Sequence, residues 1–345
     1  MKILVTGSSG VLGANLVDYL LEQNLEVVGF DISKVKPEHA HKIQFIQGSI
    51  TDQEDVKRAC HGVDVIVHAA SASPAFSEER IFEIIVEGTH NLLQQAKSQN
   101  VERFVYVSST AVYGLPERVP MLESDPIQPY HDPYNRAKAE AEKLCLTFRE
   151  DGLCLPILRP RTFLGPQRLG TFAMLFEWAK EGRNFPMLGN GQNRYQFLDV
   201  YDLCSAVFLA CTRPKDRAND TFNIGAKEFG TMKDTYQAVL DAAGFGKKIR
   251  CVPAKPALWM LDILSALNLS PLYKRLYQKL NRDYYASIEK AESQLGFKAK
   301  YSNNEALVRS FRWYCLHSAQ MANATGHGNN VPWNQGILKY GKVFF

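Results

Sequence analysis

Short apolar runs rich in β-branched residues alternate with longer amphipathic stretches over the first half of the chain. Five of these runs predict buried strands, at residues 2–5, 26–30, 44–46, 64–67 and 103–107. Residues 11–23 and 78–99 instead place apolar side chains at helical spacing, which predicts two helices that each bury one face. Strands that alternate with helices in this order favour an α/β fold with a doubly wound parallel sheet.

The alternation ends after Leu158, where segments with Pro and Gly interrupt the pattern. Because one hydrophobic core rarely spans 345 residues, we expect a sheet domain over residues 1–165 and a smaller substrate lobe over residues 166–320. Helical patterns that should pack back on the sheet domain occur at residues 172–182 and 200–212. Residues 321–345 show no clear period, and no role is predicted for them.

Composition excludes several classes of protein. Apolar residues make up 46% of the chain and charged residues 22%, which is typical of a globular protein. The net charge is only +4, with basic and acidic residues interspersed, so no nucleic-acid partner is expected. The apolar stretch at residues 256–269 is too short to span a bilayer, although it can touch a membrane surface.

The cysteines and the start of the chain bear on location. The chain has seven cysteines without a C-x-x-C pair, which favours reduced thiols, with neither disulfides nor a metal site. No basic leader or apolar export signal precedes Gly7. We therefore expect a cytoplasmic protein.

The segment TGSSGVLG at residues 6–13 follows a predicted strand and opens a predicted helix. In this setting Gly7 permits a tight turn, Gly10 lets the backbone approach a pyrophosphate, and Gly13 lets the helix pack closely on the strand. The start of the helix then offers unpaired N–H groups to phosphates. A glycine pattern alone fits an ordinary turn equally well, but its place between strand and helix favours a dinucleotide site.

Asp31 stands at the end of the second predicted strand, roughly 20 residues after the glycine loop. Its carboxylate can accept hydrogen bonds from both ribose hydroxyls of an adenosine and would repel a 2′-phosphate. This position therefore predicts NAD rather than NADP. Lys34 and Lys36 could weaken that repulsion, although solvated loop lysines are the simpler interpretation.

Tyr134 and Lys138 are four residues apart in a helical pattern, so both side chains lie on one face. A tyrosine has an ordinary pKa of about 10, and a fixed ammonium nearby would lower that pKa towards neutrality. Such a spacing is most often an ordinary surface pair. Here it follows a strand that ends in Ser108, Ser109 and Thr110, whose hydroxyls emerge at the edge where doubly wound sheets bind ligands.

Several motifs occur in a fixed order: the glycine loop, DVIVHAA at residues 64–70, VSSTAVYG at residues 107–114, Tyr134-x-x-x-Lys138 and LRP at residues 158–160. Together they resemble the extended short-chain dehydrogenase/reductase family of NAD-dependent epimerases and dehydratases, over residues 1–317. The resemblance implies a Rossmann domain with a smaller C-terminal α/β substrate lobe, NAD as cofactor and hydride transfer at a secondary alcohol. It also suggests a homodimer formed through helices at residues 78–99 and 134–150.

The resemblance implies a role for each matching residue. Ser109 would hydrogen-bond the reacting oxygen, with Thr110 as the neighbouring alternative, Tyr134 would exchange its proton, and Lys138 would hold the nicotinamide ribose. His68 would line the cofactor channel rather than act as a base. The implied cofactor contacts are Gly7, Ser9, Gly10, Val11, Leu12, Gly13, Asp31, Ser49, Ile50, His68, Ala69, Ala70, Val107, Tyr134, Lys138, Arg159 and Pro160. The implied substrate contacts are Ser109, Thr110, Tyr134, Arg161 and Arg194.

Departures from the family pattern bear on the ligands. Ser49 replaces an Asp that often reaches the adenine, so that contact is weakened or moved to Asp52, and Ile85 replaces a common Asn. Tyr195 stands where nucleotide-sugar epimerases usually carry an arginine for the diphosphate, and Arg194 is displaced by one residue. In a strand this shift would turn the arginine to the opposite face, unless a bulge restores it.

Two activities stay open within the family. An epimerase would return the hydride to the other face of a transient ketone, whereas a 3β-hydroxysteroid dehydrogenase-like enzyme would release NADH. Residues 253–267 resemble an apolar segment of the latter, although an ordinary core helix explains them equally well. A redox-inactive NAD-binding regulator is the alternative from another class, and intact Ser109, Tyr134 and Lys138 argue against it.

Overall fold

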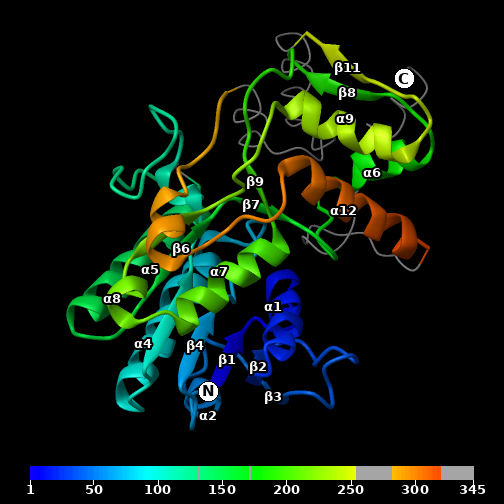
Figure 1. The fold of residues 1–345 in the computed structure, drawn as a ribbon. Helices are drawn as coiled ribbons and strands as arrows, with labels where there is room; N and C mark the ends of the chain where they lie inside the picture. Colours follow the sequence, from blue (N-terminus) through cyan, green and yellow to red (C-terminus); the bar gives the residue numbers. More distant parts are fainter. Residues whose placement is uncertain (130–131, 171, 254–281, 320–345) are drawn as a thin grey trace. The chain divides into compact units, whose positions relative to one another are not determined.

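The computed structural model describes residues 1–129, 132–170, 172–253 and 282–319 (Figure 1). The chain divides into two compact units. The first unit comprises Met1–Arg161, Val200–Gly225 and Ala286–Ala299, and the second comprises the described residues of Thr162–Asp199, Ala226–Tyr285 and Lys300–Phe345. The apolar stretch at residues 256–269 and the tail at 321–345 lie outside the described residues, as does all but the first residue of the segment 253–267.

A seven-stranded sheet forms the centre of the first unit, and every neighbouring pair of its strands is parallel. β1 lies between β2 and β4, so the strand order reverses next to the turn that follows β1 (Figure 1). Doubly wound sheets bind ligands at such a reversal. The predicted Rossmann fold is confirmed, with the strands in the order β10 (Thr221–Ile224), β6 (Ile157–Pro160), β5 (Arg103–Val107), β4 (Val65–His68), β1 (Lys2–Thr6), β2 (Glu26–Asp31) and β3 (Gln44–Gln47).

Helices cover both faces of this sheet (Figure 1). On one face, α2 (Gln53–Ala59), α4 (Gly88–Ser98) and α5 (Pro133–Glu150) bury their apolar side chains in a cluster with residues of the central strands. On the other face, α1 (Val11–Glu22) packs against α7 (Val200–Thr212). Each helix buries one apolar stripe, as its sequence pattern predicts.

The predicted helix over residues 78–99 is divided in the structure. It comprises α3 (Glu78–Phe82), a π-helical turn η1 (Glu83–Glu87) and α4. Extra residues per turn rotate the side chains that follow, so such a turn changes which residues of α4 face the sheet. The shorter elements of the first unit are η2 (Thr110–Tyr113), α8 (Lys215–Ala218) and η3 (Ala291–Leu295).

The second unit combines short parallel strand pairs with helices. β7 (Thr162–Leu164) pairs with β9 (Phe197–Asp199), and β8 (Phe185–Leu188) pairs with β11 (Ile249–Val252). Three helices share its apolar core, namely α6 (Phe172–Lys180), α9 (Met232–Ala243) and α12 (Asn303–His317). Of the two helical patterns expected on the sheet domain, α7 belongs to the first unit, whereas α6 belongs to the second. None of the helices that the structure describes has the length and hydropathy needed to cross a bilayer.

The glycine loop determines how closely α1 approaches β1. Gly13 lies in the first turn of α1, and a Cβ atom there would lie only 2.0 Å from the carbonyl oxygen of Gly7. A Cβ atom at Gly10 would lie 3.1 Å from the same oxygen. Helix and turn are therefore in direct backbone contact at position 13, which explains why only glycine fits there.

We expect Gly13→Ala to lower the free energy of unfolding by at least about 2 kcal/mol, because the new methyl group overlaps backbone atoms. Gly10→Ala is the matched control, since its methyl group has more room and Gly10 has an ordinary φ of −73°. This control should cost less than about 1 kcal/mol. Urea denaturation without added cofactor measures both values, and equal losses would contradict the close-contact argument.

Candidate active site

The turn between β1 and α1 is suited to an anion. Gly10 is the N-cap residue of α1 and has no side chain that could compete with a ligand for the N–H groups at the helix start. Gly7 has a φ of +70°, and a Cβ atom there would lie 2.8 Å from Cα of Ala70, the second residue after β4. The other loop residues predicted to contact a cofactor lie in this turn or the first helical turn: Ser9, Val11, Leu12 and Gly13.

Asp31 ends β2 beside this turn. One carboxylate oxygen, Oδ2, accepts a hydrogen bond from the backbone N–H of Ser9 at 2.9 Å, and Oδ1 accepts one from Ser33 at 2.8 Å. Each oxygen has a further lone pair, so the half-buried carboxylate can still accept hydrogen bonds from a diol. Lys34 is exposed, whereas Lys36 is half-buried, and burial lowers the pKa of its ammonium.

Asp55 on α2 holds Ser49 in the segment after β3. The backbone N–H of Ser49 donates to Oδ2 of Asp55 at 3.0 Å, and its hydroxyl pairs with Thr51 at 2.8 Å. Asp52, the alternative adenine contact, accepts the N–H of Asp55 and so caps α2. Ile50, also a predicted cofactor contact, is buried, and its side chain fills the space beside Gly88.

His68, the last residue of β4, belongs to a buried chain of hydrogen bonds. The hydroxyl of Thr89 donates to the carbonyl of Ile85, so its oxygen accepts the Nε2 proton of His68 across 3.0 Å. The Nδ1 atom of His68 is then an acceptor, and it receives the hydroxyl proton of Thr6 across 2.8 Å. The oxygen of Thr6 in turn accepts the backbone N–H of Ala70 at 3.2 Å. The direction of the chain thus assigns one tautomer to His68.

His68 is therefore held as a neutral ring. Burial lowers its pKa to about 3, and the charge of Lys138 acts in the same direction. A second ring proton would also face the hydroxyl proton of Thr6, which would have to turn away. A base for proton abstraction at neutral pH needs a pKa near 7, so these contacts argue against that role for His68.

The end of β5 presents hydroxyls of different availability. Ser109 is half-exposed, and its oxygen accepts the N–H of Ala111 at 3.1 Å, which leaves its proton for another acceptor. Thr110 is buried, donates to the carbonyl of Pro160 at 3.3 Å and accepts from Nη1 of Arg161 at 3.1 Å. Of the two candidates, Ser109 is the one whose hydroxyl can still donate to a substrate oxygen.

α5 carries Tyr134 and Lys138. Asp132 caps the helix by accepting the N–H of Asn135 at 3.1 Å, so Tyr134 lies in the first turn and Lys138 one turn later. The buried ammonium of Lys138 donates to the carbonyl of Val107, the last residue of β5, at 3.0 Å. Burial lowers the pKa of Lys138 to about 8. The lysine thus connects α5 to the strand end that leads into Ser109.

Arg159 in β6 and Arg161 just after it both form contacts inside the first unit. Nη2 of Arg159 donates to Oε2 of Glu142 at 2.7 Å, and Nη1 donates to the hydroxyl of Tyr113 at 2.7 Å. Arg161 is only 2% exposed and bonds Thr110. Contact of Arg159 with a cofactor and of Arg161 with a substrate stay predictions.

Arg194 lies in the second unit, and its guanidinium lies over two rings that pack against each other, with 5.1 Å between the ring centres of Phe229 and Tyr285. Its central carbon is 4.9 Å from the ring centre of Phe229 and 4.7 Å from that of Tyr285. Tyr195 next to it packs against Phe197, with 4.9 Å between ring centres. Arg194 is exposed, so its side chain remains accessible beside this ring pair.

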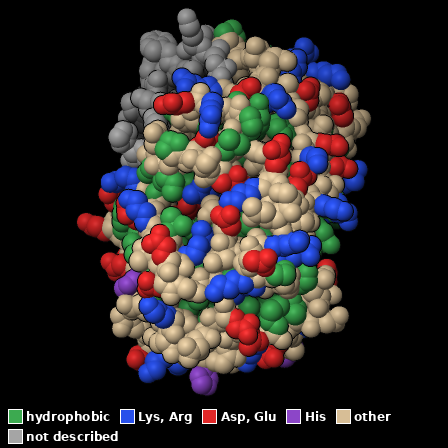
Figure 2. All heavy atoms as spheres, turned by 60° about the vertical axis from the view of Figure 1, so that its left-hand side comes forward, with side chains coloured by type: hydrophobic (Ala, Val, Ile, Leu, Met, Phe, Trp, Pro, Cys, Tyr) green, Lys and Arg blue, Asp and Glu red, His purple; other side chains and the backbone are tan. Residues whose placement is uncertain are grey.

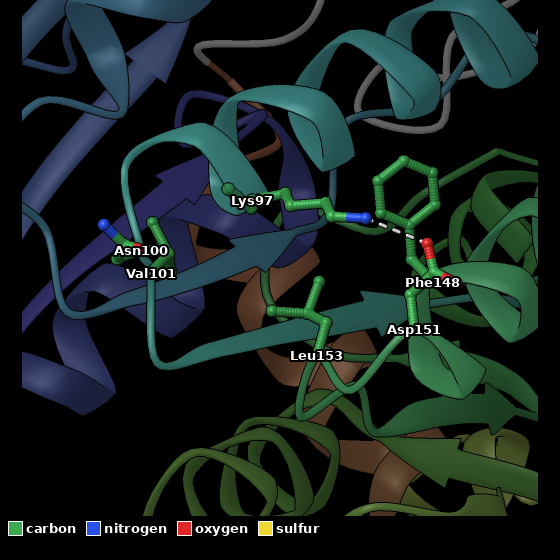
Figure 3. A pocket seen from close by; sticks show the side chains of 7 residues that line it. Lys97, Asn100, Val101, Phe148, Asp151 and Leu153 are labelled. Atoms are coloured by element: carbon green, nitrogen blue, oxygen red, sulfur yellow. Dashed lines mark hydrogen bonds and ion pairs between the residues drawn. The ribbon is translucent and has the colours of Figure 1, made fainter.

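Two surface hollows lie on the helical layer of the first unit, away from these residues. One, of about 250 Å³, lies where α4 and α5 end, and there Lys97 pairs with Asp151 at 2.9 Å (Figure 3). The other, of about 430 Å³, lies between α2 and α4. Neither hollow, as lined by described residues, contains a predicted site residue. The described ranges also contain no group of three or more His, Cys, Asp or Glu side chains that could hold a metal ion.

A model of the NAD dependent epimerase/dehydratase family matches residues 3–225. The chain belongs to this family. The resemblance to extended short-chain dehydrogenase/reductases is thereby confirmed, because the matched range contains the glycine loop, the Tyr134 and Lys138 pair and the strand before Arg161.

Similar proteins span nearly the whole chain. An uncharacterized protein, y4nG, from Sinorhizobium fredii is 36% identical over 97% of this chain and 84% of the relative. The 3 beta-hydroxysteroid dehydrogenase/Delta 5→4-isomerase of Mycobacterium tuberculosis is 28% identical over 93% of this chain and 92% of the relative. Among solved structures, the UDP-glucose 4-epimerase of Thermus thermophilus in complex with NAD is 25% identical, with a TM-score of 0.71, over 91% of this chain and 99% of the other.

The residues of this epimerase/dehydratase-family member fit NAD at two places. The start of α1 and the close backbone approach at Gly7 suit a pyrophosphate, and the carboxylate of Asp31 suits a ribose diol. Sequence reasoning missed Thr89, the partner of His68, and Glu142, the partner of Arg159. Glu142 follows Lys138 by four residues, a spacing that could have drawn attention to it.

The depressed pKa of His68 makes the family member sensitive to acid. The unfolded chain binds a proton at His68 near pH 6.5, whereas the folded protein resists it down to about pH 3. The stability contributed by the neutral ring is present above pH 6.5 and is lost as the pH falls, by up to about 1.4 kcal/mol per pH unit. His68→Gln should therefore flatten the dependence of the unfolding free energy on pH between 6 and 4.

The matched control is His61→Gln, which changes an exposed histidine and should keep the wild-type slope. Urea denaturation at several pH values measures all three proteins. A wild-type slope for His68→Gln, or a ring nitrogen signal of His68 that titrates near pH 6.5 in the NMR spectrum, would contradict the neutral assignment.

Proposed function

We propose that this protein transfers a hydride between NAD and the carbon of a secondary alcohol or its ketone. The observation that carries this proposal is the burial of Lys138, whose ammonium bonds the carbonyl of Val107 one helical turn from Tyr134. A buried ammonium is costly, which supports a functional rather than a structural role. A redox-inactive regulator would gain nothing from it.

The chain's own residues divide the proton chemistry between them. Tyr134 donates its hydroxyl proton to the carbonyl oxygen during reduction and accepts it during oxidation, and the charge of Lys138 stabilises the phenolate. Ser109, whose hydroxyl proton is available, holds the reacting oxygen in place. NAD, when bound, supplies the carbon that accepts or returns the hydride. Asp31 favours NAD because a 2′-phosphate there would meet a second negative charge.

A substrate without a diphosphate is the best match to the second unit. The guanidinium of Arg194 lies over the adjoining rings of Phe229 and Tyr285, and Tyr195 takes the position of the expected cation. Without that cation a diphosphate would lose a charge-assisted contact of roughly 1.5–3 kcal/mol. These contacts support a dehydrogenase or reductase for an apolar alcohol, of the kind the mycobacterial relative is named for. Nucleotide-sugar epimerisation is the second candidate, and the exposure of Arg194 favours it.

We expect NADH to appear when the protein is mixed with NAD and a hydroxysteroid from a panel, but not with UDP-sugars. Tyr134→Phe should lower kcat by about 10²- to 10⁴-fold, with NAD affinity nearly unchanged, because only the proton donor is lost. Absorbance at the NADH band and calorimetric titration of NAD measure the two effects.

Interconversion of UDP-sugars without net NADH would instead identify the epimerase, and Arg194→Gln should then weaken sugar-nucleotide binding. Full turnover by Tyr134→Phe would remove Tyr134 from its proposed role. Absence of any turnover, with NAD bound, would favour the regulator.

We also infer a homodimer in a reducing compartment, acting on a small molecule. All seven cysteines are free thiols, which supports the cytoplasm. Basic and acidic side chains are intermixed on the face shown in Figure 2, in keeping with a small-molecule rather than a nucleic-acid partner.

The dimer proposal is supported by half-buried apolar side chains on the η1 and α5 surfaces, including Ile84 and Leu144.

We expect sedimentation at micromolar concentration to give a dimer, and Ile84→Glu combined with Leu144→Glu to give a monomer, because charges would enter an apolar interface. Phe245→Glu is the control, since this exposed phenylalanine lies between α9 and β11, and the dimer should persist. A monomeric wild-type protein would refute the proposal.

A further inference from the structure

Glu142 and Arg159 form an ion pair that is almost entirely removed from solvent. Their side chains are 0% and 5% exposed. Nε of Arg159 lies 3.1 Å from each carboxylate oxygen of Glu142, and Nη2 lies 2.7 Å from Oε2. Removing both charges from water costs free energy that their mutual attraction often does not offset, so stability alone is a weak reason for such a pair.

Further hydrogen bonds orient both members of this pair. The hydroxyl of Ser108 donates to Oε1 of Glu142. Nη1 of Arg159 donates to the hydroxyl of Tyr113 at 2.7 Å, and that hydroxyl donates to Oδ1 of Asn223 at 2.8 Å. The pair is therefore joined at once to the residue that follows β5, to η2 and to β10. Its geometry leaves little freedom to either charge.

The same contacts reach the proposed proton-transfer residues. Ser108 lies between Val107, whose carbonyl accepts from Lys138, and Ser109. Glu142 lies one turn after Lys138 on α5. The end of β5 is thus bonded to α5 at two points. Lys138 donates to the carbonyl of Val107, and Glu142 accepts the hydroxyl proton of Ser108.

Electrostatics point the same way. Burial lowers the pKa of Lys138, and the nearby Cys145 and Glu142 raise it. Burial also keeps the thiol of Cys145, the ring of Tyr106 5.0 Å away on β5 and the ring of His68 on β4 neutral at pH 7. Tyr134, one turn earlier on α5, is the group proposed to exchange the proton. The carboxylate of Glu142 is consequently the main negative charge that favours the ammonium form.

We propose that Glu142 and Arg159 are positioning residues for proton transfer, acting through Lys138 and through the strand end that carries Ser109. Arg159 holds the carboxylate in a fixed orientation, and the carboxylate favours the charged ammonium and bonds the residue that follows β5 to α5. This inference rests on the proposed function, because it assigns the pair to the same reaction.

Glu142→Gln tests the inference, since it keeps the shape of the side chain but removes its charge. Lys138 must be charged to stabilise a phenolate, so the loss of activity at alkaline pH should begin at a lower pH, by about one unit. We expect kcat at pH 8 to fall roughly 10-fold or more while KM changes little. Glu142→Asp, which keeps the charge, should recover part of both losses.

Glu140→Gln is the matched control, because Glu140 is an exposed residue of the same helix that pairs with Lys143 at 2.8 Å. It should retain the wild-type pH profile. Where Glu142→Gln is too unstable to purify, the double variant Glu142→Met/Arg159→Met removes both members of the ion pair, so that neither is left as an unpaired buried charge. That variant should fold and show the same low kcat and shifted profile.

The Cε signal of Lys138 in the NMR spectrum, assigned with Lys138→Met, reports its titration without any turnover. A lower midpoint in Glu142→Gln supports the inference even if no substrate is converted, in which case only the proposed function fails. A folded Glu142→Gln or double variant with the wild-type midpoint and the wild-type pH profile would overturn the inference and leave the proposed function intact.

Discussion

The contact between the ammonium of Lys138 and the carbonyl of Val107 is the interaction on which the candidate site depends. A charged amine buried in the protein must be compensated by acceptors, and a strand can offer a free carbonyl only where its hydrogen-bond ladder ends. α5 must therefore cross the sheet at the carboxyl end of β5. This requirement places Tyr134 and Ser109 at the edge where doubly wound sheets bind ligands.

Local sequence patterns predicted the sheet well. Each of the first five strands begins and ends within one residue of its predicted bounds. Buried runs rich in β-branched and aromatic residues leave little choice of structure, and β3, at the edge of the sheet, is partly exposed. The glycine loop was equally predictable, because a side chain at Gly7 or Gly13 would overlap backbone atoms and only glycine fits there. The place of Asp31 beside the glycine loop was predictable too, because it is the residue at which the second strand ends.

Partners that are distant in sequence could not be predicted. The pairing of Glu142 with Arg159 and the stacking of Arg194 on Tyr285 depend on how separate elements meet. The π-helical turn at Glu83–Glu87 breaks a continuous apolar stripe, and periodicity alone gives no sign of it. The placement of α6 in the second unit, where residues 172–182 were expected to pack on the sheet domain, could not be predicted for the same reason, because an amphipathic pattern does not determine which surface covers the apolar face.

The interleaved order of the two units has a consequence for synthesis on the ribosome. β10, an edge strand of the first sheet, is not translated until residues 221–224, and the last segment of that unit is Ala286–Ala299. At roughly 5–20 residues per second, the nascent sheet waits several seconds with an open edge at β6. An unpaired parallel strand is a template for association, so this interval is when chaperones have the most to protect.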